Sequence, residues 1–330
     1  MADNNNNLML DIRDLTIHYE TDSGVVHAVE GLNLQLGRGE SLGFVGETGA
    51  GKTTTALGIM RLIPNPPGKI KSGQIVFDGE DLLKKSEAEM RHIRGGKIAM
   101  IFQDPMTSLN PVMTVDKQIA EMIKLHRNVS EHEAMKQAGD MLELVGIRRE
   151  RMHDYPHQFS GGMKQRVVIA IALACDPELL IADEPTTALD VTIQAQVLEL
   201  MKKLKQQFSA SMILITHDLG IVADICDKVA IMYAGRVVEY ADKRSLYSNP
   251  LHPYTIGLFK SVPDIDEDVD ELPVIPGLMP DPMALPAGCA FHPRCSMAEE
   301  ICSKERPQMA ELEPGHFAAC PVRARMMGRA

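Results

Sequence analysis

Short apolar runs alternate along the chain with segments whose apolar residues have helical spacing. Apolar and polar residues alternate from Leu10 to Tyr19, and a Gly-punctuated strand pattern follows over 25–36. A period of two predicts strands with one buried face. The apolar runs 179–182 and 212–215 predict buried strands of the kind found in parallel sheets. Further strands are expected over 41–45, 73–77 and 97–102.

Helices are expected between these strands. The spacing predicts helices over 52–62, 160–174 and 191–208, and it predicts a helical insert over 114–146. Residues 229–240 have the pattern of a β-hairpin. Buried strands that alternate with helices indicate a mostly parallel sheet with helices on both faces, so we predict the α/β fold class.

Charge and hydropathy argue against several classes of function. The 330 residues carry a formal net charge of −11, so the basic excess of proteins that neutralise nucleic-acid phosphates is absent and no nucleic-acid partner is expected. The longest apolar run, 167–175, is about half of the ~20 residues that span a bilayer. The polar, Asn-rich start lacks the features of a signal peptide. We expect a cytosolic protein, and any role at a membrane would be peripheral.

A phosphate-binding loop is the clearest functional motif. Residues 46–53 fit the pattern G-x-x-x-x-G-K-[ST] between a predicted strand and a predicted helix, a context that argues against a Gly-rich turn without function. Glycines let backbone N–H groups curl around phosphates, Lys52 adds a positive charge, and the Thr53 hydroxyl can ligate Mg²⁺. The expected nucleotide-binding residues here are Gly46, Glu47, Thr48, Gly49, Ala50, Gly51, Lys52, Thr53 and Thr54.

Two acids follow the buried strand 179–182. Carboxylates at the carboxyl end of a parallel strand lie at the ligand edge of the sheet. We expect Asp183 to hold Mg²⁺, and we expect Glu184 to orient and polarise the attacking water. An acidic turn after a core strand is the alternative, and the upstream phosphate loop argues against it.

Other polar residues lie at strand ends and at one helix start. Gln103 and His217 each follow a predicted strand, and we expect them to contact the Mg²⁺–water system and the γ-phosphate, respectively. Ser160-Gly161-Gly162 opens a helix, where the Ser hydroxyl and the backbone N–H groups form an anion site. A second anion site suggests that a second chain covers the other side of the nucleotide. A structural histidine and a plain helix cap are the alternatives.

The order of these motifs resembles the ATP-binding cassette family over about residues 8–245. The resemblance implies that Tyr19 stacks on adenine, with an ordinary strand aromatic as the alternative. It also implies that Asp190 lies in a loop crossing to a partner cassette. Two cassettes would enclose two ATP molecules head to tail, with Ser160 of one reaching the γ-phosphate held by Lys52 of the other. The implied fold is a P-loop nucleotide-binding domain with a RecA-like core, an antiparallel β subdomain and a helical subdomain at about 104–165.

One residue departs from the family signature. Met163 stands where that signature usually has Gln, and its side chain cannot donate a hydrogen bond. The anion-binding residues before it are intact, so we expect activity to survive.

Several segments resemble the ATPase subunits of bacterial oligopeptide and dipeptide importers, namely 101–111, 159–163, 249–255 and 288–321. The resemblance implies ATP hydrolysis that energises peptide uptake from the cytoplasmic face of the cell membrane. It implies as partners a second, related ATPase subunit, two transmembrane permease subunits and an extracytoplasmic peptide-binding protein. Importers of nickel, glutathione or sugars have similar ATPases, and a soluble cassette ATPase acting on ribosomes or DNA is the more distant alternative.

A cysteine-rich tail follows a segment of different composition. Residues 263–288 contain six prolines and a run of acids, which predicts an extended linker. Thiolates suit zinc or an iron–sulfur cluster, and the wide spacing argues against a structural zinc site. The resemblance implies a [4Fe–4S] cluster, with zinc and unliganded thiols as alternatives. The four cysteines, within 289–321, are Cys289, Cys295, Cys302 and Cys320. We therefore divide the chain into a cassette, 1–245, and a small Cys-rich extension, 246–330.

Overall fold

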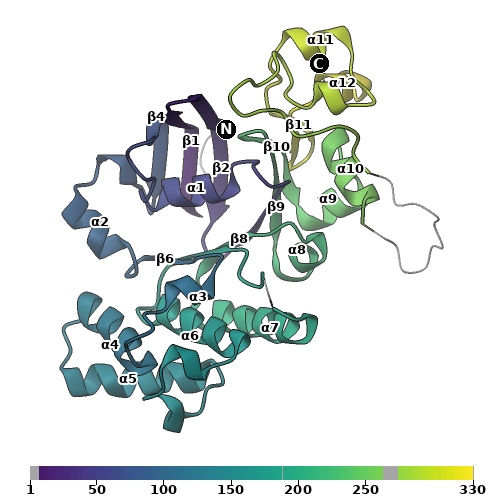
Figure 1. Cartoon of the computed structure of the whole chain (residues 1–330). Coiled ribbons are helices and arrows are strands. Elements are labelled where there is room, and N and C mark those ends of the chain that lie inside the picture. The colour runs from purple at the N-terminus through teal and green to yellow at the C-terminus, as the bar shows by residue number, and fades with distance from the viewer. Residues whose placement is uncertain (1–6, 188, 263–273, 330) are drawn as a thin grey trace. The chain divides into compact units, whose positions relative to one another are not determined.

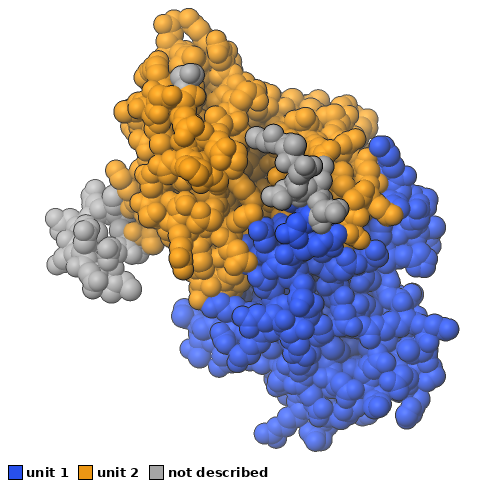
Figure 2. Space-filling model, turned by 180° about the vertical axis from the view of Figure 1, so that it is seen from behind, with its two compact units in different colours: residues 1–9, 37–41, 84–215 blue, residues 10–36, 42–83, 216–330 orange. Residues whose placement is uncertain are grey.

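The structure, a computed structural model, describes residues 7–187, 189–262 and 274–329 (Figure 1). It forms two compact units, which Figure 2 shows in blue and orange. Unit 1 contains residues 1–9, 37–41 and 84–215, and unit 2 contains residues 10–36, 42–83 and 216–330. The first part of the predicted linker, 263–273, lies outside the described residues.

Unit 1 is built on three parallel strands, which are β6 Ile98–Ile101, β7 Leu179–Asp183 and β8 Ser211–Ile215. β7 pairs in parallel with both of the others. All residues of β7 and β8 are buried, as their apolar runs predicted. Each large aliphatic side chain buried here contributes about 1.5–3 kcal/mol, and the parallel order brings the carboxyl ends of β6 and β7 to one edge.

The helices of unit 1 are α2 Glu87–Ile93, α3 Pro105–Ser108, α4 Val115–His126, α5 Glu131–Leu144, α6 Gly161–Leu173 and α7 Val191–Phe208, with 3-10 turns η3 Arg149–Arg151 and η4 Pro156–Gln158 before α6. α6 is largely buried and contacts α3, α4, α5, α7 and β6. The predicted insert consists of α4 and α5. Ser130 is the N-cap of α5, because its side chain accepts a hydrogen bond from the N–H of Glu133.

One sheet of unit 2 is antiparallel, in the order β2–β1–β4–β5. Its strands are β1 Leu8–Thr21, β2 Gly24–Gly37, β4 Gly68–Phe77 and β5 Glu80–Asp81. β4 begins at Gly68 rather than at the predicted Gly73. Lys69 and Lys71 in its first half form ion pairs with Glu20 of β1, and this polar half lacks the apolar pattern used for the prediction.

The other strands of unit 2 follow the order β3–β9–β10–β12–β11. They are β3 Ser41–Val45, β9 Lys228–Tyr233, β10 Arg236–Asp242, β12 His316–Ala318 and β11 Ala310–Glu313. β3 and β9 are parallel, and β9 and β10 form the predicted hairpin. The sequence did not reveal β11 and β12, because strands this short show no clear period. Through β12 the C-terminal extension is hydrogen-bonded to β10.

The helices of unit 2 are α1 Lys52–Ile59, α8 Leu219–Ile225, α9 Lys243–Ser248, α10 Pro253–Lys260, α11 Glu300–Lys304 and α12 Pro321–Met326, with 3-10 turns η2 Leu82–Lys84 and η5 His292–Arg294. α1 ends before the predicted Leu62. Arg61 has a φ of +51°, and the N–H of Leu62 bonds to the carbonyl oxygen of Leu57 at 2.8 Å, which is a left-handed helix ending. In the described ranges, no helix combines the length and the apolar character needed to cross a membrane.

Candidate functional site

The phosphate loop in unit 2 joins β3 to α1, and close packing fixes its glycines. Gly51 has a φ of +104°, and a Cβ on it would lie 2.3 Å from the carbonyl oxygen of Ala28 in β2. A Cβ on Gly46 would lie 2.2 Å from the carbonyl oxygen of Met232 in β9. Only glycine fits at these two positions. The loop is therefore held against two strands, and the first N–H groups of α1 offer an anion site.

Lys52 is the first residue of α1, and Tyr19 of β1 lies beside the first turn of this helix. The Lys52 side chain is buried, and its Nζ donates to the carbonyl oxygens of Gly46 at 2.6 Å and Glu47 at 3.0 Å. The Tyr19 hydroxyl lies 3.5 Å from Oγ1 of Thr54. The ring expected to stack on adenine is thus next to the first turn of the phosphate-binding helix, and its stacking stays a prediction.

Glu47 is held by two residues that the sequence analysis did not identify. Its N–H donates to the hydroxyl oxygen of Tyr254 at 2.9 Å, and both of its carboxylate oxygens accept from Nη1 of Arg294 at 3.1 Å. Burial acts to lower the pKa of Arg294, but its bonds to the Tyr233 hydroxyl and to Glu47 outweigh this effect, and the pKa is raised. The segment 249–255 stood out in the sequence as a family feature, but nothing local showed that its tyrosine reaches the loop.

In unit 1, the structure brings Gln103 and Glu184 together. Asp183 is the buried last residue of β7, and Glu184 follows with a φ of +45°. Nε2 of Gln103 donates to Oε2 of Glu184 at 3.1 Å, and Oγ1 of Thr187 donates to the same oxygen at 3.0 Å. A carboxylate oriented in this way beside a strand end is suited to polarise a water molecule.

The exposed Ser160 is the N-cap of α6, and its Oγ accepts a hydrogen bond from the N–H of Met163 at 3.4 Å. Arg151, which the sequence did not single out, supports this segment. Its guanidinium lies 4.6 Å from the centroid of the buried Phe159 ring, and its Nη1 lies 3.5 Å from the sulfur of Met163. Met163 therefore has a structural contact in place of the hydrogen bonds that a Gln would make.

The two glycines after Ser160 have different surroundings. A Cβ on Gly162 would lie 2.3 Å from Cγ2 of Ile193 in α7, so this glycine is required for the packing of the two helices. A Cβ on Gly161 would meet only Cδ2 of Leu189, at an ordinary 3.7 Å. Space therefore remains beside the backbone of Gly161.

The last two residues predicted for the nucleotide site belong to different units. Asp190 in unit 1 is exposed and caps α7, because its Oδ1 accepts from the N–H of Ile193 at 3.0 Å. His217 in unit 2 is exposed and lies between β8 and α8. The predicted residues are thus divided between the units: Tyr19, the phosphate loop and His217 belong to unit 2, and the others belong to unit 1.

Comparisons with known proteins agree with these motifs. The ABC transporter family model matches residues 29–187, and the model described as "Oligopeptide/dipeptide transporter, C-terminal region" matches residues 238–302. The "Probable peptide ABC transporter ATP-binding protein y4tR" of Sinorhizobium fredii is 51% identical over 316 residues, which are 95% of this chain and 94% of that protein. This chain belongs to the ABC transporter family. It is an ATP-binding subunit of that family, in which ATP hydrolysis is coupled to transport.

Other relatives of this ABC ATPase cover it to a similar extent. The "Oligopeptide transport ATP-binding protein OppD" of Bacillus subtilis is 51% identical over 94% of this chain and 87% of its own length. The Escherichia coli protein of that name is 49% identical over 94% and 92%. Among solved structures, the ATP-binding cassette MJ0796 bound to ADP and Pi is 27% identical and aligns with a TM-score of 0.64 over 71% of this chain and 98% of its own.

The four cysteines near the C-terminus of this ABC ATPase, of six in the chain, all lie in unit 2. Cys302 and Cys320 are buried together, and Cys289 packs against them. Burial raises the pKa of Cys289 to about 11, against the lowering effect of a hydrogen bond from the N–H of Phe291, and the other three thiols raise it further. Burial also raises the pKa of Cys295 and of Cys320. Such thiols ionise readily only beside a cation.

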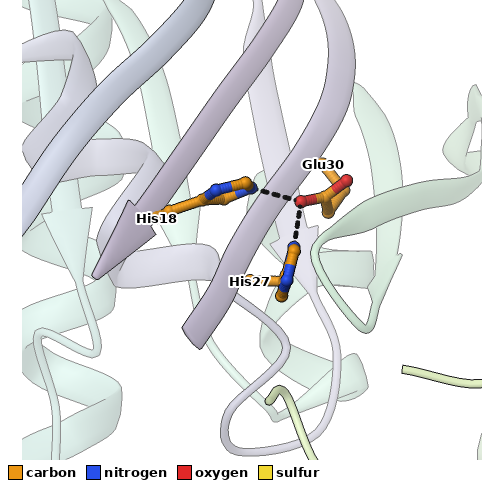
Figure 3. A group of neighbouring side chains, drawn as sticks. All are labelled: His18, His27 and Glu30. Atoms are coloured by element: carbon orange, nitrogen blue, oxygen red, sulfur yellow. Dashed lines mark hydrogen bonds and ion pairs between the residues drawn. The ribbon is translucent and has the colours of Figure 1, made fainter. Parts of the chain in front are cut away.

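Two histidines share one carboxylate on β1 and β2 (Figure 3). His18, His27 and Glu30 are the one group of three close metal-ligand side chains in the part of the chain that the structure describes. His18 Nε2 lies 2.5 Å and His27 Nδ1 lies 2.7 Å from Oε1 of Glu30, and Arg306 Nη1 lies 3.6 Å from Oε2. Because the positive charge of Arg306 opposes a metal ion at Glu30, we interpret the group as a network of ion pairs.

Proposed function

We propose that this ABC ATPase energises the uptake of oligopeptides or dipeptides across the cell membrane. The observation that carries the proposal is the match of residues 238–302 to a region described for oligopeptide and dipeptide transporters, in a chain about half identical to oligopeptide transport proteins. The protein would act as a peripheral subunit on the cytoplasmic face, bound to two permease subunits. A peptide-binding protein outside the membrane would deliver the substrate.

We assign the parts of the chain accordingly. Residues 1–245 form the nucleotide-binding cassette, with a RecA-like core, an antiparallel β subdomain and a helical subdomain at about 104–165. Residues 246–330 form the Cys-rich extension. The antiparallel sheet of β1, β2, β4 and β5 and the helices α4 and α5 support the division within the cassette.

ATP hydrolysis would rest on the residues identified from the sequence. The phosphate loop with Lys52 binds the phosphates, and His217 contacts the γ-phosphate. Glu184 is the general base, and its bonds to Gln103 and Thr187 orient it for this role. The oxygens of Thr53, Gln103 and Asp183 are the hard ligands that suit Mg²⁺, which neutralises charge on the transferred phosphoryl group.

The partner cassette would be a second, related ATPase subunit. Ser160, the N–H groups after it and Asp190 lie at exposed helix starts of unit 1. The space beside Gly161 lets another molecule approach the backbone there. These features support a role for the Ser160 segment in binding the γ-phosphate held by the partner.

We also propose that the four cysteines hold a [4Fe–4S] cluster. The donor set fits, because backbone N–H groups of Phe291, Met297 and Val322 point at Cys289, Cys295 and Cys320, respectively, and such bonds stabilise thiolates on a cluster. Sulfurs bound to one zinc ion at 2.3 Å would lie about 3.8 Å apart. No three of these four sulfurs lie within 4.8 Å of one another in the described residues, which favours the larger cluster over zinc.

Iron analysis tests the cluster. Protein purified anaerobically is expected to contain iron and acid-labile sulfide and to absorb visible light. The Cys295→Ser variant is expected to lose all three. A colourless wild-type protein with stoichiometric zinc would contradict the cluster and leave the ATPase chemistry intact.

Co-purification tests the transport function. The chain is isolated from gently solubilised native membranes, and the bound proteins are identified. Two polytopic permeases and a second cassette ATPase are expected. Peptide-dependent stimulation of ATP hydrolysis by the purified assembly, reconstituted with its binding protein, would then establish the substrate class. Ribosomal or DNA-repair proteins in place of permeases would overturn the proposal.

A further inference from the structure

One buried arginine of the Cys-rich extension contacts the phosphate loop. Arg294 directly precedes Cys295, and its side chain is 7% exposed. Its Nη1 donates to both carboxylate oxygens of Glu47 at 3.1 Å, and its Nε donates to the carbonyl oxygen of Pro276 at 2.9 Å. The ring centroid of Phe291 lies 6.0 Å from the guanidinium carbon. These contacts hold the guanidinium in one orientation, toward the loop.

Glu47 passes this contact on to the loop, of which it is the second residue. Its carbonyl oxygen accepts from the N–H of Ala50 at 3.1 Å and from Nζ of Lys52 at 3.0 Å, while its own N–H donates to Tyr254. The residue is therefore fixed from inside the loop by its backbone and from outside by Arg294 and Tyr254. A phosphate loop binds through the directions of its N–H groups, so fixing Glu47 prepares the loop for ATP.

A second contact of the extension reaches the strands beside Tyr19. Arg306 is paired with Glu30, whose other oxygen is shared by His18 and His27 (Figure 3). The N–H of His27 also donates to the carbonyl oxygen of Pro282, at 2.9 Å. Within unit 2, the extension thus contacts the strands beside Tyr19 through Arg306 and Pro282, and it contacts the loop itself through Arg294 and Tyr254.

We propose that Arg294 is a positioning residue for ATP binding and that the four-cysteine segment keeps it in place. It acts through Glu47. Loss of the metal that we propose for the four cysteines disorders the segment around Cys295, which releases the guanidinium and lowers the affinity for ATP. The proposal rests on the role of loop 46–53 in binding ATP, and neither the transported substrate nor the identity of the metal affects it.

The expected loss of ATP affinity follows from the Glu47 carboxylate that is left without its partner. Removal of the guanidinium leaves the Glu47 carboxylate, which is 27% exposed, without this ion pair. Loss of a charge-assisted hydrogen bond shifts the equilibrium between the fixed and the released loop by about tenfold or more. Arg294→Ala should therefore raise the Kd and the KM for ATP about tenfold. The kcat at saturating ATP should stay within about twofold, because the groups that orient Glu184 are unchanged.

Equilibrium dialysis with Mg²⁺ and labelled ATP measures this affinity on the full chain purified anaerobically. The variants are Arg294→Ala, Glu47→Gln and the double substitution, with Arg325→Ala as the matched control. Arg325 lies in the same extension and pairs with Glu299 at the surface. Each single variant should weaken ATP binding about tenfold. The double variant should bind ATP no more weakly than the weaker-binding single variant, because each single substitution already removes the one contact that the two residues share. An unchanged Kd for Arg294→Ala, or fully additive losses, would overturn the proposal.

Two further measurements separate this role from folding and from the cluster. Thermal unfolding is recorded for every variant, and where Arg294→Ala does not fold, Arg294→Lys and Glu47→Gln decide the result. Cys295→Ser should lose its metal and weaken ATP binding by the same factor as Arg294→Ala. Loss of metal with unchanged ATP affinity would overturn the link between the cysteines and the loop. A failure of the peptide-uptake function would appear in the co-purification experiment instead.

Discussion

At the scale of single residues, two hydrogen bonds orient Glu184, which we propose as the general base. The carboxylate accepts hydrogen bonds from two polar side chains on one oxygen, Gln103 at 3.1 Å and Thr187 at 3.0 Å. A strand end alone would place the residue without orienting it. The sequence predicted the position from the apolar run before it, whereas the bond from Thr187 depends on the turn that follows.

Glu184→Gln should abolish most of the hydrolysis and leave ATP binding intact. An amide cannot accept a proton from water, and general-base catalysis contributes about 10²–10⁴-fold to a rate. Single-turnover hydrolysis and ATP affinity are measured on one preparation. Glu178→Gln is the control, because that residue lies at the opposite end of β7 and pairs with Lys97. Hydrolysis by Glu184→Gln at the wild-type rate would remove Glu184 from the role of base.

A second residue-scale effect concerns His252, which is buried and caps α10 by accepting the N–H of Tyr254. Burial lowers its pKa from 6.5 to about 4, and the nearby Glu239 opposes this shift. Below pH 6.5 the unfolded chain takes up a proton that the folded chain excludes, so the contribution of this group to stability is present above pH 6.5 and is lost as the pH falls toward 4. The loss between pH 7 and pH 5 is about 2 kcal/mol.

His252→Asn should make the stability less dependent on pH. Asn keeps an acceptor for the helix cap and does not titrate. Urea unfolding at pH 7 and pH 5 is followed by circular dichroism for both proteins. The wild type should lose about 2 kcal/mol more than the variant over this interval. Equal losses of stability in the two proteins would show that His252 takes up its proton at pH 5 in the folded protein as it does in the unfolded chain.

At the scale of elements, local patterns predicted most of the strands and helices that carry the candidate nucleotide site. Apolar runs defined β3, β7 and β8, and one motif placed the phosphate loop. The patterns failed where a tertiary contact determines where an element ends or whether it forms. The left-handed Arg61 ends α1, ion pairs extend β4, and β12 is short and depends on pairing with β10. The contact of Tyr254 and Arg294 with the loop joins residues more than 200 positions apart, which no local pattern can reveal.

The two glycines at the start of α6 should separate packing from function. Gly162→Ala places a Cβ 2.3 Å from Ile193, so α6 and α7 must move apart, which costs about 1–3 kcal/mol. Gly161→Ala meets nothing closer than 3.7 Å, so its stability should equal that of the wild type. Its ATPase activity, measured with the partner cassette, should still fall, because the added methyl group occupies the approach to the backbone. Full activity of Gly161→Ala would remove this glycine from the anion site.

At the scale of the whole molecule, the residues predicted for one nucleotide site belong to two compact units. Unit 2 carries the phosphate loop and Tyr19, and unit 1 carries Gln103, Glu184 and the Ser160 segment. The sequence gives the order of these motifs but not the grouping, because compact units here are assembled from three separate stretches each. The sequence of one chain also cannot identify the partner that we propose for the exposed Ser160 and Asp190.

The partner surface can be tested at Val191, which follows Asp190 and is 83% exposed. Such exposure of a large apolar residue beside a residue expected to cross to the partner suggests that the partner covers it. In the Glu184→Gln background, where ATP is retained, this chain should form a one-to-one complex with the second ATPase subunit of the same transporter. Val191→Asp should weaken that complex at least about tenfold, because a charge would be buried in it.

Light scattering after size-exclusion chromatography measures this association, with and without ATP. Val112→Asp is the control, since Val112 is 79% exposed but lies before α4, away in sequence from both helix starts expected to meet the partner. ATP affinity of the isolated chain should be the same in both variants, which separates loss of pairing from loss of nucleotide. If this chain forms an equally tight complex with itself, the partner is a second copy. If Val191→Asp binds the partner as tightly as the wild type does, the start of α7 lies outside the interface. The Ser160 segment must then reach the nucleotide of the partner without a contact at the start of α7.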